Sequence, residues 1–188
     1  MIQGIINYSH HLLEESVTPG DTVIDATCGN GHDTLVLSKF AGKEGKVLAF
    51  DIQEQAIQNT RALLEKHERN NVELICDSHE KLNEYLAAGL YNQIGGAIFN
   101  LGYLPGGDKS VITEAKSTII ALDAILLSLK HTGLVILVIY PGHQGGQEEK
   151  EAVLKHVINL DQKFFNVLQY RFINQKNNPP FIVAVEKK

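Results

Sequence analysis

Residues 23–34 constrain the fold more than any other part of the chain. They read Val-Ile-Asp-Ala-Thr-Cys-Gly-Asn-Gly-His-Asp-Thr, which predicts a buried strand, a glycine-rich turn and the start of a helix. Gly29 and Gly31 bracket the turn, and residues without a Cβ let backbone N–H groups approach a ligand closely. A second strand is predicted over residues 46–51. It ends at Asp51, where nucleotide-binding folds place an acid that accepts from ribose hydroxyls. This combination predicts an α/β protein that binds an adenosine-containing cofactor.

The same turn distinguishes between two candidate cofactors. Dinucleotide binding uses the pattern G-x-G-x-x-G, whose third glycine permits close packing of helix and strand beneath a pyrophosphate. This chain has Thr34 at that place. S-adenosylmethionine has no pyrophosphate, and its cationic sulfonium and ammonium groups favour nearby carboxylates, which Asp25 supplies directly or through water. We therefore expect S-adenosylmethionine rather than NAD, with a tight turn that binds no ligand as the alternative.

Predicted strands and helices alternate along the chain, as they do in a doubly wound parallel sheet. Apolar residues recur at near-helical spacing between Ile2 and Leu13, which predicts an N-terminal amphipathic helix. The last two strands are joined by a segment too short for a crossover helix, so they must form an antiparallel hairpin. We predict an α/β fold with a mostly parallel seven-stranded sheet, similar to the Rossmann-like class I methyltransferase fold. After the first strand, the predicted strands cover residues 46–51, 72–76, 94–101, 134–140, 164–174 and 181–186, and the predicted helices cover 32–40, 53–66, 110–129 and 148–160.

Length and composition are typical of one globular domain. The 188 residues are 44% hydrophobic and 21% charged, and we expect a single unit over residues 1–188. No secretory signal is recognisable, and the longest apolar run, residues 134–140, is too short to span a bilayer, so we expect a cytoplasmic protein without a membrane segment. Cys28 and Cys76 lack C-x-x-C spacing, which predicts neither a metal site nor a disulfide framework. The net charge of −5 does not favour a dedicated nucleic-acid binder, although a local basic patch would suffice for one.

Polar segments follow several of the predicted strands, at the carboxyl ends where such sheets bind their ligands. A carboxylate after the third strand can accept a hydrogen bond from an adenine amino group. Asp and Ser at this place also cap helices, and for Asp77 and Ser78 both roles stay open. The candidate cofactor-binding residues are Asp25, Gly29, Asn30, Gly31, His32, Asp51, Gln53, Asp77, Ser78 and His79.

The segment after the fourth predicted strand is expected to carry the chemistry. Methyl transfer is an in-line displacement that needs a lone pair held about 3 Å from the methyl carbon. Asn-Pro-Pro-Tyr loops of amino-methyltransferases use an Asn side-chain oxygen for this purpose. Here Asn100 and Tyr103 match that loop, while Leu101 and Gly102 replace the prolines. Asp108 is the nearest carboxylate, and it either serves a cationic amine or caps the helix that follows. The candidate catalytic residues are thus Asn100, Tyr103 and Asp108.

Several motifs together resemble the small bacterial rRNA methylase family, which includes the tRNA 5-aminomethyl-2-thiouridine methyltransferases of Gram-positive bacteria. They are the glycine turn, Phe50-Asp-Ile-Gln53, the segment from Asn100 to Asp108, and Tyr140-Pro-Gly-His143. The resemblance covers nearly the whole chain. It implies S-adenosylmethionine as donor, the anticodon stem-loop of tRNA as partner, methylation of the primary amine on a modified wobble uridine, and a homodimer. An aliphatic amine suits the loss of the two prolines. The residues that it implies for the cofactor site are Asn30, Asp51, Gln53, Ser78 and His79.

Other functions stay open at this point. The acidic balance is also typical of a methyltransferase that acts on a small molecule, whereas basic side chains around the Asn100 loop would favour RNA. Within the RNA methyltransferases, rRNA is the alternative substrate. A non-catalytic nucleotide-binding module would bind the cofactor without turning it over.

Overall fold

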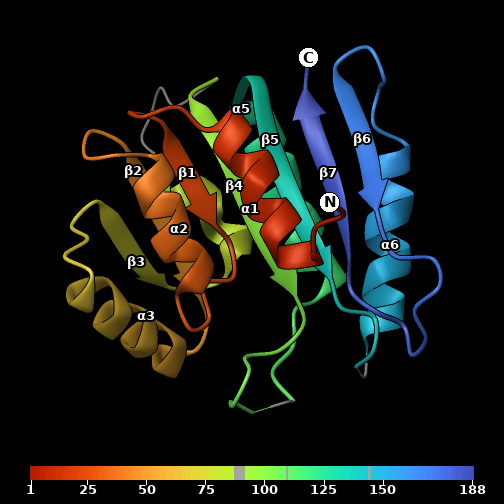
Figure 1. Cartoon of the computed structure of the whole chain (residues 1–188), viewed down its shortest axis with the longest axis horizontal. Coiled ribbons are helices and arrows are strands. Elements are labelled where there is room, and N and C mark those ends of the chain that lie inside the picture. The colour runs from red at the N-terminus through yellow and green to blue at the C-terminus, as the bar shows by residue number, and fades with distance from the viewer. Residues whose placement is uncertain (87–91, 109, 144) are drawn as a thin grey trace.

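A twisted, mostly parallel sheet forms the middle layer of the molecule (Figure 1). The computed structural model describes residues 1–86, 92–108, 110–143 and 145–188. The described residues form a seven-stranded sheet in the order β3-β2-β1-β4-β5-β7-β6, in which β7 runs antiparallel to both of its neighbours. The strands are β1 Thr22–Asp25, β2 Lys46–Asp51, β3 Val72–Cys76, β4 Ile94–Leu101, β5 Leu129–Ile139, β6 Phe165–Tyr170 and β7 Phe181–Lys187.

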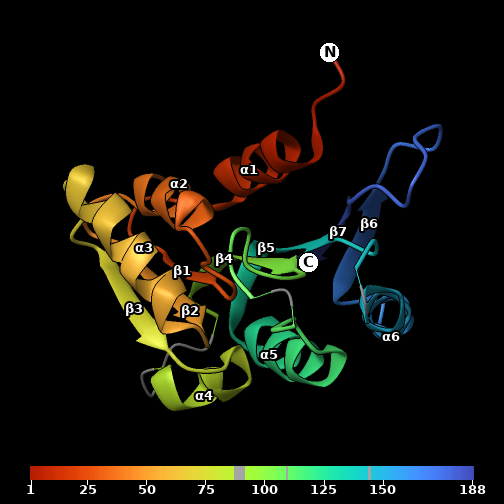
Figure 2. The ribbon, with the colours of Figure 1, turned by 90° about the horizontal axis from the view of Figure 1, so that it is seen from below.

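Helices cover both faces of this sheet. Seen along the sheet edge, α1, α2 and α3 lie on one side and α4, α5 and α6 on the other (Figure 2). Their boundaries are α1 Ile5–Ser16, α2 His32–Phe40, α3 Glu54–Lys66, α4 Leu82–Tyr85, α5 Ala115–Ser128 and α6 Gly146–Ile158, with a short 3₁₀ helix, η1, over His79–Lys81. Within the described ranges, no helix is long and apolar enough to cross a lipid bilayer.

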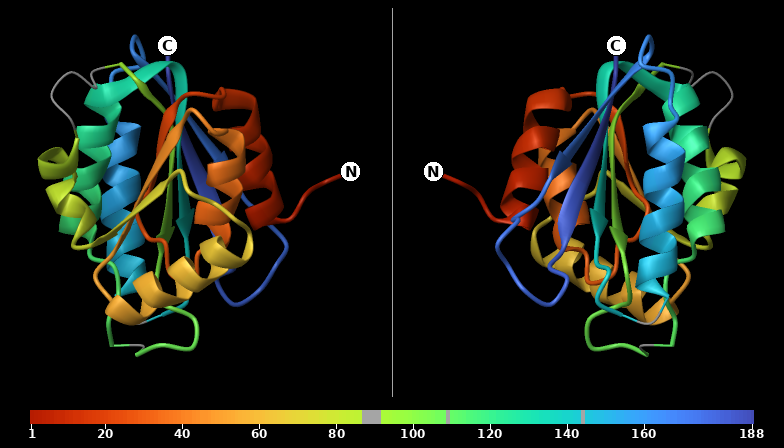
Figure 3. Two further views of the ribbon diagram at one scale, coloured as in Figure 1. Left: turned by 90° about the vertical axis from the view of Figure 1, so that its left-hand side faces the viewer. Right: turned by 90° about the vertical axis from the view of Figure 1, so that its right-hand side faces the viewer.

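The hydrophobic core is split by the sheet into two clusters. Phe50, Phe99 and Ile125 belong to the cluster under α5 and α6, and Leu13 and Leu37 belong to the cluster under α1 and α2. The central strands are apolar along nearly their whole length because parallel strands covered by helices are buried on both faces. The two side views show the sheet enclosed between these helix layers (Figure 3).

The order of the strands reverses between β1 and β4. From β1 the chain moves outward through β2 and β3, and it then returns to β4 and continues through β5 in the opposite direction. At such a switch point two neighbouring connections leave toward opposite faces, which opens a crevice at the carboxyl ends of the strands. The glycine turn follows β1 and the Asn100 loop follows β4, so the two most informative segments of the sequence meet at this crevice.

The predicted fold class is confirmed, and the differences lie at the ends of elements. The predicted helix over 110–129 begins only at Ala115, because Tyr103 forms a β-bridge with Ile112 and the N–H of Thr113 donates to the Gly102 carbonyl. The predicted strand over 164–174 is shorter, since β6 ends at Tyr170. The helical turns η1 and α4 were not predicted.

Candidate active site

The glycine turn is closed by local hydrogen bonding and close packing. The N–H of Gly31 donates to the Cys28 carbonyl over 2.7 Å, and Gly31 has a left-handed backbone with φ of 83°. A Cβ at Gly31 would lie 2.9 Å from the Cα of Thr60 in α3. Both the backbone angle and this contact require glycine. The result is a narrow turn at the start of α2.

Asp25 supports this turn from inside the protein. Its side chain is fully buried, and its two carboxylate oxygens accept hydrogen bonds from the backbone N–H of Thr27 (3.2 Å) and the hydroxyl of Thr34 (2.6 Å). Burial, with a smaller contribution from the charge of Asp33, raises the pKa of Asp25 to about 7. Thr34, which replaces the third glycine of the dinucleotide pattern, is therefore a partner of Asp25. This geometry suits an acid that holds the turn in place from inside the protein, and not one that lies at the surface of the turn.

Asp51 connects the end of β2 to the glycine turn. Its carboxylate accepts from the backbone N–H groups of Gly29 (3.0 Å) and Gln53 (2.9 Å). Burial raises the pKa of Asp51, and these two hydrogen bonds oppose that rise. Each carboxylate oxygen keeps a second lone pair for a ligand. The next residue, Ile52, exposes 56% of its surface at the same edge and offers an apolar face beside the acid.

Asn30 connects the glycine turn to two neighbouring segments. Its side-chain oxygen accepts from the amide of Asn59 in α3 (2.9 Å), and its own amide donates to the Pro105 carbonyl in the loop after β4 (3.3 Å). The hydroxyl of Thr60 also donates to the Gly29 carbonyl over 3.0 Å. These contacts hold the turn, α3 and the loop together. His32, the first residue of α2, is exposed.

The segment after β3 has a capping function in this structure. Ser78 is the N-cap of η1, and its hydroxyl accepts from the N–H of Glu80 (3.3 Å). Asp77 accepts from Lys81 and from the Tyr85 hydroxyl, and these hydrogen bonds lower its pKa. The sequence left capping and ligand binding open for this pair. The structure shows the capping contacts, while ligand binding stays a prediction.

His79 differs from its neighbours because it is buried. Its Nδ1–H donates to the Ala26 carbonyl over 2.9 Å, since a carbonyl can only accept. Its other ring nitrogen, Nε2, is buried and has no hydrogen-bond partner among the residues that the structure describes. Burial lowers the pKa of His79. A neutral imidazole with a free acceptor nitrogen therefore lies close to Asp51, the main-chain turn and Phe99.

Asn100 is fixed in one orientation at the end of β4. Its backbone N–H donates to the Thr27 hydroxyl (2.7 Å), and its side-chain Nδ2 donates to Oδ2 of Asp33 (2.6 Å). Because an ionised carboxylate only accepts hydrogen bonds, the amide nitrogen must face Asp33. The side chain is half-buried, and its Oδ1 atom accepts no hydrogen bond from the described part of the chain. Asn100 thus presents an acceptor oxygen at the switch point.

Asp33 and His10 complete this cluster, and the sequence analysis did not select either of them. His10 of α1 donates from Nε2 to Oδ1 of Asp33 over 2.6 Å, and the two side chains expose 23% and 13% of their surfaces. A signal was present in the sequence: His10 falls on the inward-facing stripe of α1, with the buried residues Ser9 and Leu13. A polar side chain on such a stripe needs a partner inside the protein.

Tyr103 and Asp108 lie in the exposed part of the loop after β4. Tyr103 is 40% exposed, and its ring lies 6.0 Å from the His143 ring at right angles to it. Asp108 accepts from the N–H (2.8 Å) and the hydroxyl (2.7 Å) of Ser110, which lowers its pKa. The expectation that Asp108 caps the following helix is wrong, because α5 begins at Ala115 with Glu114 as its N-cap. Asp108 instead closes a local turn.

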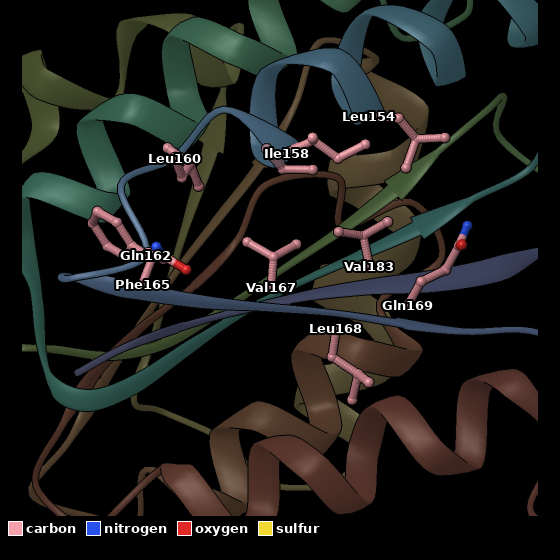
Figure 4. Close-up of a pocket in the computed structure, with 10 residues that line it drawn as sticks. Leu154, Ile158, Leu160, Gln162, Phe165, Val167, Leu168, Gln169 and Val183 are labelled. Carbon is pink, nitrogen blue, oxygen red and sulfur yellow. The ribbon is translucent and has the colours of Figure 1, made fainter.

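A second hollow lies at the β6 edge of the sheet, between α6 and β6 (Figure 4). It lies beyond β5 and β7, away from the switch point. Its lining includes Leu154, Ile158, Phe165, Val167 and Val183, and its polar side chains are those of Gln162 and Gln169. None of the described residues in its lining has a titratable side chain, so the cluster of polar side chains at the switch point is the better candidate for chemistry.

The strand order, the antiparallel β7 and the glycine turn after β1 define the class I methyltransferase fold. Solved structures of low sequence similarity share it, including a SAM-dependent O-methyltransferase from Thermotoga maritima, which is 15% identical with a TM-score of 0.68. The chain belongs to the family described as "Putative rRNA methylase", whose sequence model matches residues 47–186.

Closer relatives cover nearly the whole chain. The crystal structure of a putative rRNA methylase from Clostridium thermocellum is 42% identical, with a TM-score of 0.95 and 100% coverage of both chains. A putative methyltransferase from Streptococcus mutans, solved in complex with SAH, is 43% identical, with a TM-score of 0.90 and 100% coverage of both chains. A chloroplastic tRNA (mnm⁵s²U34)-methyltransferase from Arabidopsis thaliana is 38% identical over 189 residues, which cover 96% of this chain and 68% of that protein.

Proposed function

We propose that this protein is an S-adenosylmethionine-dependent methyltransferase that acts on RNA. The observation that carries the proposal is Asn100, whose side-chain oxygen is presented at the switch point while its amide nitrogen is held by Asp33. The family and the SAH complex of the Streptococcus mutans relative support the choice of reaction and cofactor. More specifically, we propose the aminomethyl group of 5-aminomethyl-2-thiouridine at the tRNA wobble position as the acceptor, which the chloroplastic relative supports.

The residues around the glycine turn suit S-adenosylmethionine, which supplies an electrophilic methyl group when bound. The backbone of the glycine turn at the start of α2 would contact the cofactor, with Asn30 and His32 beside it. Asp51 would accept from the ribose hydroxyls, with Gln53 and the apolar face of Ile52 next to it. Asp77, Ser78 and His79 would border the adenine, and Asp25 would hold the turn in place.

The substrate side of the site is suited to a neutral amine nitrogen. Asn100 Oδ1 would accept one N–H of the amine and thereby direct the nitrogen lone pair toward the methyl carbon. Tyr103 would flank the substrate from the exposed loop. A flexible aliphatic amine can enter such a site without the flat clamp that two prolines would provide. Leu101 and Gly102, which replace those prolines, are consistent with this acceptor.

The rim of the site has a charge pattern that supports RNA over a small molecule. The β6–β7 connection, residues 171–180, lies at the same edge of the sheet as the Asn100 loop, because Phe181 is paired with Ile139 at the end of β5. It contains Arg171 and Lys176 and no acidic residue, although the chain as a whole has a net charge of −5. Basic side chains gathered on one rim can neutralise the phosphates of an RNA backbone. Lys109, in the Asn100 loop, lies outside the described residues.

A direct assay tests the proposed function. The purified protein is incubated with S-adenosylmethionine and tRNA from cells in which the wobble uridine stops at the aminomethyl stage, and the nucleosides are analysed by mass spectrometry. We expect the methylaminomethyl nucleoside to appear. Methylation of rRNA but not of tRNA would identify an rRNA methyltransferase. Methyl transfer only to small amines would identify a small-molecule methyltransferase. Binding of S-adenosylhomocysteine without turnover of any substrate would indicate a non-catalytic module.

The Asn100→Ala variant tests the role of the acceptor oxygen. Because Asn100 would act in the chemical step and not in holding the cofactor, we expect a large loss of kcat with nearly unchanged affinity for S-adenosylhomocysteine. Single-turnover kinetics, calorimetry and a melting curve measure the three quantities. Wild-type turnover in a stable variant would exclude Asn100 from the mechanism. Loss of both stability and cofactor binding would make it a residue whose side chain only ties the loop to its neighbours.

The family resemblance also leads us to propose a homodimer that works in the cytoplasm. We propose the cytoplasm because an enzyme that modifies tRNA must work in the compartment that contains its substrate. Light scattering coupled to size exclusion should give twice the chain mass of 20.8 kDa. Cell fractionation should place the protein with the soluble tRNA. A monomer at micromolar concentration would contradict the first expectation.

A further inference from the structure

The carboxylate that lies beside Asn100 is Asp33, not Asp108. Asp33 Oδ2 accepts from the Asn100 amide over 2.6 Å, whereas Asp108 is engaged with Ser110 in an exposed turn. Asp33 is the second residue of α2, where the backbone N–H groups of the first turn also favour a negative charge. An ammonium group that approached Asn100 Oδ1 would therefore meet Asp33 as its neighbouring anion.

Two side-chain hydrogen bonds hold the Asp33 side chain in place. His10 and Asn100 donate to different oxygens of Asp33, and both hydrogen bonds are 2.6 Å long. Since each oxygen has two lone pairs, one acceptor position on each remains after these contacts. The side chain keeps 13% of its surface exposed, so a substrate or water can reach it.

The other titratable groups around Asp33 come from three elements. His10 faces it from α1, and Tyr140 follows β5. Asp25 lies below it at the end of β1. The charge of Asp33 contributes to a raised pKa for both Asp25 and Tyr140, so the two groups closest in electrostatic terms tend to keep their protons. Of the two acids, Asp33 keeps an exposed surface, whereas Asp25 is fully buried.

We propose that Asp33 is the catalytic carboxylate that binds the substrate ammonium beside Asn100 and accepts its proton, and that His10 is the positioning residue that holds Asp33. This inference rests on the proposed amine acceptor. The ammonium N–H proton passes to Asp33, and the freed lone pair forms the new C–N bond with the methyl carbon. The C–S bond breaks and its electron pair stays on sulfur, which becomes a thioether. The product is a secondary ammonium, and Asp33 returns the accepted proton to solvent.

The Asp33→Asn variant separates charge from geometry. An asparagine can still accept from Asn100 through its oxygen and can donate to His10, whose ring nitrogen becomes the acceptor in the other tautomer. The shape of the cluster is kept while the negative charge and the proton acceptor are lost. We expect kcat on aminomethyl tRNA to fall roughly 100-fold near neutral pH, as when a general base is removed. The affinity for S-adenosylhomocysteine should change little.

The pH profile gives a readout that a structural role would not move. As the pH approaches the pKa of an alkyl ammonium, about 10, the amine loses its proton without help. The deficit of Asp33→Asn relative to the wild type should therefore shrink toward alkaline pH. An equal deficit at every pH would overturn the role in proton transfer. A stable Asp33→Asn protein with wild-type kcat at neutral pH would overturn the whole inference.

Three further substitution sites complete the test. His10→Gln keeps an amide donor for Asp33 and should retain most of kcat, whereas His10→Ala should lose it. This pair decides the role of Asp33 if Asp33→Asn does not fold, and equal kcat in the two His10 variants would then overturn the inference.

Asp108→Asn addresses the competing carboxylate, and a loss of kcat confined to this variant would overturn the assignment to Asp33. Asp123→Asn is the matched control, since Asp123 also pairs with a histidine, His156, over 2.7 Å but on the exposed faces of α5 and α6.

The wild-type assay distinguishes failure of this inference from failure of the proposed function. A wild-type protein that methylates no amine-bearing tRNA would overturn the proposed function and this inference with it. An active wild type with an unimpaired Asp33→Asn variant would overturn this inference alone.

Discussion

At the scale of single residues, the site is a set of polar side chains that hold one another. Asp25 and Asp33 are two acids of one cluster that lie in different environments. Asp25 is fully buried, with a pKa near 7, whereas Asp33 is partly exposed and accepts from two side-chain donors. Asp25 can therefore gain or lose its proton near neutral pH, and the free energy of unfolding should depend measurably on pH.

We expect Asp25→Asn to reduce that dependence. The ordinary pKa of 3.8 applies in the unfolded chain and about 7 in the folded protein, so between these values the folded state keeps a proton that the unfolded chain has lost. The free energy of unfolding therefore falls as the pH rises from 4 to 7, by at most about 4 kcal/mol from this group. Asparagine imitates the protonated acid toward Thr27 and Thr34. Melting curves at pH 5 and pH 8 should differ less in the variant, and an unchanged difference would contradict the buried acid as its source.

Asp51→Ala addresses the cofactor at the same scale. A carboxylate that accepts from ribose hydroxyls makes hydrogen bonds worth roughly 1.5–3 kcal/mol. Calorimetry should show a more than tenfold loss of affinity for S-adenosylhomocysteine, with no binding of NADH by either protein. Because Asp51 also accepts from Gly29 and Gln53, a melting curve must confirm the fold. Normal affinity in a folded variant would remove Asp51 from the ribose site.

At the scale of elements, sequence patterns predict those helices, strands and turns that interactions between neighbouring residues determine. The strand–turn–helix over residues 23–34 was predictable because apolar runs and glycines specify it directly. The start of α5 was not, since residues 110–114 are kept out of the helix by contacts with the distant Gly102 and Tyr103. The sequence analysis selected His32 for the cofactor site, which stays a prediction, and it missed its neighbour Asp33, whose side chain contacts Asn100. One residue turns a helix by 100°, and the sequence does not reveal which side chain faces inward.

Gly31→Ala tests the turn as an element. The positive φ and the 2.9 Å approach of a Cβ to Thr60 should together lower the free energy of unfolding by about 2–4 kcal/mol and weaken S-adenosylhomocysteine binding. Gly106→Ala is the matched control, because Gly106 has the same φ of 83° but no atom within 4 Å of its Cβ position. The control should lose about 1 kcal/mol. Equal losses in the two variants would show that backbone strain, and not the contact with α3, limits this turn.

At the scale of the whole molecule, the position of the site follows from the order of the strands. No local pattern encodes that β4 returns to lie beside β1, yet this return joins Asn100 to Thr27 and Asp33. The sequence predicted a sheet with ligands at its carboxyl edge, while the neighbours across the crevice became known only from the fold. The same edge receives the β6–β7 connection, although it lies about seventy residues further along the chain.

This arrangement makes a prediction about how a protein of net negative charge meets RNA. Arg171 and Lys176 are exposed on the rim beside the site, so the Arg171→Ala/Lys176→Ala variant should raise KM for tRNA while kcat and S-adenosylhomocysteine affinity stay close to wild type. Each lost phosphate contact should lower the slope of log affinity against log salt by roughly 0.7–0.9. The control removes two exposed lysines of the opposite edge, Lys43 and Lys163, and keeps the total charge matched. If both double variants weaken tRNA binding equally, the attraction is a general effect of charge, and the rim formed by residues 171–180 does not select the face on which RNA binds.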